Sequence, residues 1–104
     1  MYLSLLSITL TQLRGFLAVV RTGSVTAAAE ELVVTQPSVS AAVSSLGRAL
    51  GFELTERVGR SIRPTLAGDA FAPYAADVIG LLEQGERAAL EAGSLPHASC
   101  GSWP

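Results

Sequence analysis

Two helix-start signals, Ser24 and Thr35, leave room between them for only one short helix and a tight turn. Serine and threonine are preferred N-caps because their side-chain oxygens accept hydrogen bonds from the first free N–H groups of a helix. Val33 and Val34 form the connection, and Pro37 stands in the first turn of the next helix, where its missing N–H costs nothing. The first of these helices has the packing face Ala28, Ala29 and Leu32. Two helices joined by so short a turn are typical of a helix-turn-helix.

Apolar residues recurring every three or four positions extend this pattern in both directions. A preceding helix is predicted from Thr11 to Arg21, ending before Gly23, with the stripe Leu10, Leu13, Phe16, Leu17 and Val20. The helix after Thr35 is predicted to reach Gly51 on the stripe Val39, Val43, Leu46 and Leu50.

Beyond Gly51 the period changes, and a two-stranded ribbon is predicted up to Pro64, with a turn at Gly59. A long last helix is then expected from Thr65 to about Ala92. Proline within a helix kinks or breaks it unless it lies in the first turns, so Pro73 weakens the prediction of one continuous helix. Residues 93–104 have no period and are expected to be disordered.

The composition fits one soluble domain, because 104 residues with 49% hydrophobic content can bury a modest core. The single cysteine, Cys100, cannot form an internal disulfide, which favours a reducing compartment. No run reaches the roughly 18 apolar residues of a membrane helix, so a cytoplasmic protein without membrane contact is expected.

Charge is distributed unevenly along the chain. Residues 1–64 carry six arginines and four glutamates, a net charge of +2, whereas residues 65–104 carry one arginine and five acidic residues, a net charge of −4. A basic N-terminal part is typical of a chain that binds a polyanion through that part.

Three segments of the sequence resemble those of a known family: LRGFLAVVRTGSVTAAAEEL, VVTQPSVSAAVSSL and RALGFELTERVGRSIRPTLAGDAF. Over residues 9–92 the chain resembles the N-terminal winged helix-turn-helix domain of LysR-type transcriptional regulators. The resemblance implies a mainly α fold with a small β-ribbon. It assigns residues 1–8 to an N-terminal extension, 9–65 to a DNA-binding domain (helix-turn-helix about 24–43, wing about 54–64) and 66–92 to a linker helix for dimerisation. The family's effector-binding domain is expected to be absent from this chain, so a small-molecule effector is expected to act only through that absent domain.

The resemblance also implies contacts to double-stranded DNA. Major-groove recognition needs short donors and acceptors at the start of a helix, and a glutamine can bond an adenine edge through two hydrogen bonds. The residues of this helix expected to bind DNA are Thr35, Gln36, Pro37, Ser38, Val39 and Ser40. Among them Gln36, Pro37, Ser38 and Ser40 are expected near base edges. Ser24 and Thr26 are expected at the phosphate backbone, and Arg60 and Arg63 on the wing, where Arg57 has a supporting place.

Three departures from the family pattern stand out. Positions that often carry arginine or glutamine are here Ala41, Ala42, Ser44 and Ser45, which predicts a smaller electrostatic contribution to DNA affinity. Gly47 replaces a usual acidic residue and weakens its helix, and Thr55 replaces a phenylalanine under the ribbon.

The long helix carries more apolar side chains than one side of a small monomer can cover: Phe71, Tyr74, Val78, Ile79, Leu81 and Leu82. These residues are expected to form a homodimer interface. The alternative is that this stripe packs on the chain's own first helix.

Other functions have less support. A helical protein-interaction module without DNA binding is the main alternative, and a winged-helix protein of another family that binds an effector in this domain is a third. The sequence contains no GxSxG motif, no phosphate-binding loop motif and no paired-carboxylate arrangement, so nothing in it indicates an enzyme. His97 and Cys100 alone do not make a zinc site, and no metal or cofactor is expected.

Overall fold

The computed structural model describes residues 8–94. Most of the predicted extension and tail, with His97 and Cys100, therefore lies outside the described residues. The elements in chain order are α2 (Leu10–Thr22), α3 (Val25–Leu32), α4 (Gln36–Leu50), β1 (Thr55–Val58), β2 (Ser61–Pro64) and α5 (Leu66–Gly93). The expected mainly α fold with a small antiparallel ribbon is confirmed.

Each described helix begins at a side-chain cap. The predicted caps Ser24 and Thr35, and also Thr65 before α5, accept hydrogen bonds from backbone N–H groups three residues ahead, at 3.1, 3.3 and 3.1 Å. At the start of α2, Thr9 and Gln12 form a capping box, because each side chain accepts from the backbone N–H of the other. These caps explain why the predicted helix bounds fall within a residue or so of the observed ones.

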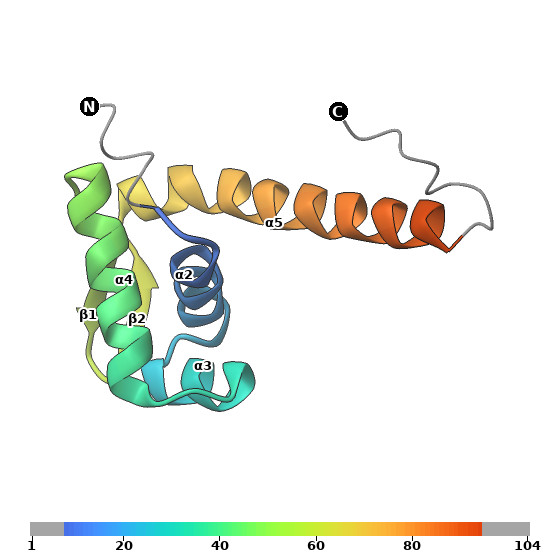
Figure 1. Ribbon diagram of the computed structural model, residues 1–104. Coiled ribbons are helices and arrows are strands. Elements are labelled where there is room, and N and C mark those ends of the chain that lie inside the picture. The colour runs from blue at the N-terminus through green and yellow to red at the C-terminus, as the bar shows by residue number, and fades with distance from the viewer. Residues whose placement is uncertain (1–7, 95–104) are drawn as a thin grey trace.

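Helix α2 lies at the centre of the core. Phe16, at 0% exposure, packs with Leu46 of α4, Leu54 before the ribbon and Ala75 of α5. A second cluster joins Val19 to the small residues of α3 and to Val39 of α4. An ion pair between Arg21 and Glu31 adds a link between α2 and α3. The first three helices therefore form one packed body with α2 in its middle (Figure 1).

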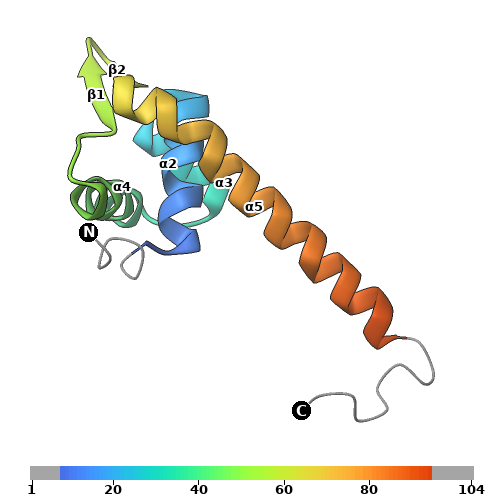
Figure 2. The same ribbon diagram turned by 90° about the horizontal axis from the view of Figure 1, so that it is seen from above.

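Helix α5 packs on this body mainly through its first half and then projects away from it (Figure 2). An ion pair between Arg14 of α2 and Glu83 of α5, 3.7 Å apart, adds a contact just beyond that half. The ring centroids of Phe16 and Phe71 lie 6.0 Å apart, and Ala75 is buried, but every residue from Leu81 to Ser94 is exposed. The helix runs on through Pro73, which is its eighth residue and lies just past its second turn. Gly93, assigned to the tail by its sequence, is instead the last helical residue, and Ser94 caps it.

Within residues 8–94, no helix is long and apolar enough to cross a membrane. Helix α5 has the length, but acidic side chains interrupt it: Asp69, Asp77, Glu83, Glu86 and Glu91.

Candidate nucleic-acid interface

The start of α4 presents a row of exposed small polar groups. The hydroxyl oxygens of Thr35 and Ser38 lie 2.8 Å apart, and Thr35 also caps the helix. Gln36 and Ser40 are exposed, and among the hydrogen bonds of the described residues none uses the Gln36 side chain. This end of α4 therefore offers a glutamine amide beside a preordered hydroxyl pair, which are groups able to form hydrogen bonds with base edges in a major groove.

Val39 is the one residue of the predicted DNA-binding set on α4 whose side chain is buried. Its side chain is 2% exposed and packs with Val19 of α2 and the alanines of α3. One helical turn places Gln36 and Ser40 on the outer face and Val39 on the inner face, because 3.6 residues complete a turn. Val39 thus holds the start of α4 against the body.

The start of α3 lies beside this surface. Ser24 is half-buried, and its hydroxyl is used in the cap of α3, whereas Thr26 is exposed. The turn from α3 to α4 contains Val33 with φ of 59° and ψ of 48°, a left-handed conformation that β-branched residues rarely adopt. Val33 is 88% exposed, and its N–H donates to the end of α3.

The ribbon carries three exposed arginines, Arg57, Arg60 and Arg63. Arg60 stands in the turn between β1 and β2. Arg63 pairs in register with Glu56 across the ribbon, and its Nε lies 3.3 Å from a Glu56 carboxylate oxygen. In the free protein, part of the positive charge of the wing is therefore neutralised by Glu56.

A backbone hydrogen bond fixes the ribbon to the helix-turn-helix. The N–H of Ile62 in β2 donates to the carbonyl of Gly23 at 3.0 Å. Gly23 ends α2 with φ of 73°, and Ser24 directly follows it as the cap of α3. Because of this bond, the wing and the start of α3 keep a fixed relation to each other.

The positions that depart from the family pattern do not add charge to α4. Ala41 and Ser44 are exposed, while Ala42 and Ser45 are half-buried. Close packing explains the glycine at residue 47, because a Cβ atom there would lie 2.9 Å from the carbonyl oxygen of Phe52.

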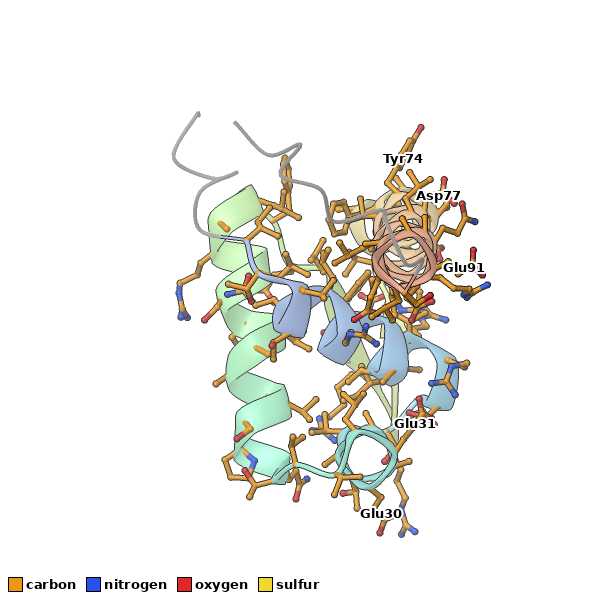
Figure 3. All side chains as sticks on the ribbon, turned by 45° about the vertical axis from the view of Figure 1, so that its right-hand side comes forward. Glu30, Glu31, Tyr74, Asp77 and Glu91 are labelled. Atoms are coloured by element: carbon orange, nitrogen blue, oxygen red, sulfur yellow. The ribbon has the colours of Figure 1, made fainter. Side chains whose placement is uncertain are left out.

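The predicted dimer residues divide into two groups. Phe71 and Ile79 are half-buried against the core, so part of the stripe does pack on the chain's own helices. Tyr74 and Leu81 are 69% and 66% exposed, and Val78 and Leu82 are also exposed. Tyr74 and Asp77 point away from the body (Figure 3). Within residues 8–94, no group of three potential metal ligands occurs.

The comparisons with known proteins agree on one family. Residues 10–69 match the family described as "Bacterial regulatory helix-turn-helix protein, lysR family". The transcriptional activator CmpR of Synechocystis is 45% identical over 76 residues, which cover 73% of this chain and 25% of that protein. The chain thus spans a quarter of the length of that curated relative.

Two solved structures show the same fold. The BenM DNA-binding domain in complex with catB site 1 DNA matches with a TM-score of 0.80 and 34% identity, over 86% of this chain and 99% of that one. OxyR of Corynebacterium glutamicum matches with a TM-score of 0.78 and 34% identity, over 83% of this chain and 27% of that one.

Proposed function

Because this chain belongs to the LysR family of bacterial helix-turn-helix regulators and contains its DNA-binding domain, we propose that it binds duplex DNA in a sequence-specific manner through the start of α4 and the wing. The observation that carries the proposal is the exposed polar start of α4. It is accompanied by an arginine-bearing ribbon that the Ile62–Gly23 hydrogen bond ties to the start of α3.

The proposed roles follow from side-chain chemistry. Gln36 reads a base edge, with adenine as the geometric match, and the Pro37 ring contacts a thymine methyl. Thr35, Ser38 and Ser40 supply hydroxyls to bases or phosphates. Thr26 and the start of α3 face the phosphate backbone, where helix N–H groups favour negative charge.

The wing supplies the electrostatic part of the binding. Arg60 is free of any ion pair within the described residues and stands at the tip, where it can enter a minor groove or contact phosphate. Arg63 contributes once its pairing with Glu56 is exchanged for phosphate. Binding therefore combines base contacts from α4 with sequence-independent contacts from the ribbon.

We further propose that the chain acts as a homodimer through α5, as part of a transcriptional regulator working in the cytoplasm. The exposed Tyr74, Val78, Leu81 and Leu82 support the dimer. Two recognition helices would then read two half-sites of a near-palindrome. The proposal requires no cofactor or catalysis, and it places any small-molecule sensing outside residues 8–94.

Selection of bound sites from random duplex DNA tests this function. The chain is expected to enrich a short motif, repeated with inverted symmetry. The variant Glu91→Gln, altered at the far end of α5, serves as the control and should enrich the same motif. A folded chain that enriches no sequence would contradict the proposal and favour the alternative of a protein-interaction module.

A further inference from the structure

The corner between α2 and α3 consists of Thr22, Gly23 and Ser24, and it contains a hydroxyl group that the proposed function does not use. Thr22 is the last residue of α2 and is half-buried. Its hydroxyl oxygen lies 2.7 Å from the carbonyl oxygen of Ala18 and 3.0 Å from that of Ser24, and it accepts a hydrogen bond from the N–H of Ser24 at 3.3 Å. A hydroxyl both donates and accepts, so this one can serve the end of α2 and the start of α3 together.

This hydroxyl closes over the residue of the corner whose backbone is least restricted. Gly23 has φ of 73° and ψ of 14°, and it has no Cβ atom that would confine its backbone. The residues on its two sides are joined by the hydrogen bond from the N–H of Ser24 to the hydroxyl of Thr22, which is a threonine turn. The bond therefore restricts the angle at which α3 leaves α2.

Ser24 in turn sets the direction of the first N–H groups of α3. Its hydroxyl accepts from the N–H of Ala27 at 3.1 Å, and its carbonyl accepts from the N–H of Ala28 at 3.0 Å. The N–H groups of Val25 and Thr26 come first in the helix, where no intrahelical acceptor is available to them. They belong to the start of α3, which is proposed above to face the phosphate backbone.

The same corner also carries the wing. The carbonyl of Gly23 accepts a hydrogen bond from the N–H of Ile62 in β2 at 3.0 Å. The side chain of Ile62 packs against the core cluster that contains the buried alanines of α3. Three consecutive residues therefore attach α2, the ribbon and α3 to one another.

We propose that Thr22 is a positioning residue for DNA binding. Its hydroxyl holds the start of α3 and, through Gly23, the wing at the separation at which both contact phosphates of one duplex. The inference rests on the proposed function and adds a residue that acts without touching DNA. Hydrogen bonds weaken steeply away from their preferred distance and angle, so a displaced corner weakens the phosphate contacts. The base contacts of α4 do not pass through this corner and stay in place.

Removal of the hydroxyl tests this role. Thr22→Val keeps the branched shape of the side chain but has no hydroxyl. At a temperature where circular dichroism shows the variant folded, fluorescence anisotropy is expected to give a dissociation constant about three- to tenfold above that of the parent. The factor should be the same on the preferred site and on unrelated duplexes, because phosphate contacts carry no sequence information. A residue that only stabilised the fold would lower the melting temperature and leave the affinity of the folded chain unchanged.

Three further variants serve as controls. Thr22→Ser keeps the hydroxyl and should bind within about twofold of the parent. Thr22→Ala removes the hydroxyl with a residue of higher helix propensity, so it supplies a second hydroxyl-free chain and should lose as much affinity as Thr22→Val. Thr11→Val removes an exposed hydroxyl from the first turn of the same helix and should bind like the parent. Among the hydrogen bonds of the described residues, none uses the Thr11 side chain.

The wing part of the proposal is tested by combining Thr22→Val with Arg60→Ala. If the hydroxyl places the wing, part of the contribution of Arg60 is already lost in Thr22→Val. The double variant should then lose less affinity than the product of the two single factors. Losses that simply multiply would show that Thr22 acts on α3 alone and would contradict this part of the proposal.

The remaining outcomes are equally distinct. Affinities equal to that of the parent for folded Thr22→Val and Thr22→Ala would overturn the proposal. A loss for Thr22→Ser as large as that for Thr22→Val would do the same, because the hydroxyl would then not be the cause. A loss confined to the preferred site would show that the corner acts on base contacts, against the proposal. A parent chain that binds no duplex would contradict the proposed function itself, and with it this role of Thr22, before any variant is measured.

Discussion

Gly68 lies so close to Leu54 that a Cβ atom on Gly68 would stand 2.0 Å from the Leu54 carbonyl oxygen. The same carbonyl accepts a hydrogen bond from the N–H of Thr65 at 3.1 Å. The hydroxyl of Thr65 donates to the carbonyl of Glu53 at 2.6 Å. The first turn of α5 is therefore locked onto the residues that lead into the wing, and the absence of a side chain at residue 68 makes this approach possible.

The first prediction concerns this approach. Gly68→Ala should lower the free energy of unfolding by about 1–3 kcal/mol or more, because the added methyl meets backbone that cannot move aside easily. Urea unfolding followed by circular dichroism measures the change.

Gly80→Ala is the matched control within the same helix. A Cβ there meets no atom within 4 Å, so the substitution should stabilise the protein by about 0.5–1 kcal/mol through helix propensity. Equal effects of the two substitutions would show that the approach of Gly68 to Leu54 is not the constraint described above.

The second prediction concerns the left-handed turn residue Val33. Val33→Gly should raise the free energy of unfolding by about 1 kcal/mol. Left-handed backbone costs an L-residue roughly 1–2 kcal/mol, which exceeds the entropy that glycine adds to the unfolded chain, about 0.5–1 kcal/mol. Little packing is lost, because Val33 is largely exposed. Urea unfolding again gives the value.

Val34→Gly provides the comparison for that substitution, since Val34 is the neighbouring residue and its φ is not positive. This variant should be less stable than the parent. Destabilisation by both glycines to the same extent would rule out backbone strain at Val33.

The third prediction concerns the wing pair Glu56 and Arg63. Glu56→Gln should tighten DNA binding and steepen its salt dependence, because Arg63 then meets phosphate without first losing a carboxylate partner. Arg60→Ala should do the opposite and reduce the slope of log K against log salt by roughly one unit. Fluorescence anisotropy titrations over a salt series measure both slopes.

Glu91→Gln removes the same charge far from the wing and should leave the slope unchanged. If Glu56→Gln and Glu91→Gln shifted the affinity equally, the gain would come from net charge alone. The proposed competition between Glu56 and DNA for Arg63 would then be wrong.

The fourth prediction follows from the burial of Val39. Val39→Ala should destabilise the fold by about 1–3 kcal/mol, because it leaves a small cavity among Val19 and the α3 alanines. At temperatures where the variant is folded, its order of preference among DNA sites should match that of the parent. A changed base preference without loss of stability would indicate that Val39 itself contacts a base.

Local signals in the sequence predicted the elements well because the caps are local. Ser24, Thr35 and Thr65 each bind an N–H three residues ahead, so their roles need no knowledge of the tertiary fold. The periodicity also placed Val39 on the inner stripe of its helix. Only the predicted set of DNA-binding residues included it among the DNA contacts.

The tertiary reasons for single residues could not be predicted in this way. Gly68 and Gly80 look alike in the sequence as weak points of one helix, yet only Gly68 has a backbone neighbour that excludes a side chain. The pairing of Arg63 with Glu56 depends on the register of the ribbon, which spacing alone did not fix. Long-range contacts of this kind are set by how the elements meet.

The role of Gln36 tests the central claim most directly. After a preferred site has been selected, binding of the parent and of Gln36→Ala should be measured by anisotropy on every single-base-pair variant of that site. We predict that Gln36→Ala loses about 1–3 kcal/mol on the preferred site and loses discrimination at one base-pair position of each half-site, with the other positions unchanged. A variant that binds every duplex as tightly and with the same preferences as the parent would contradict recognition through the start of α4.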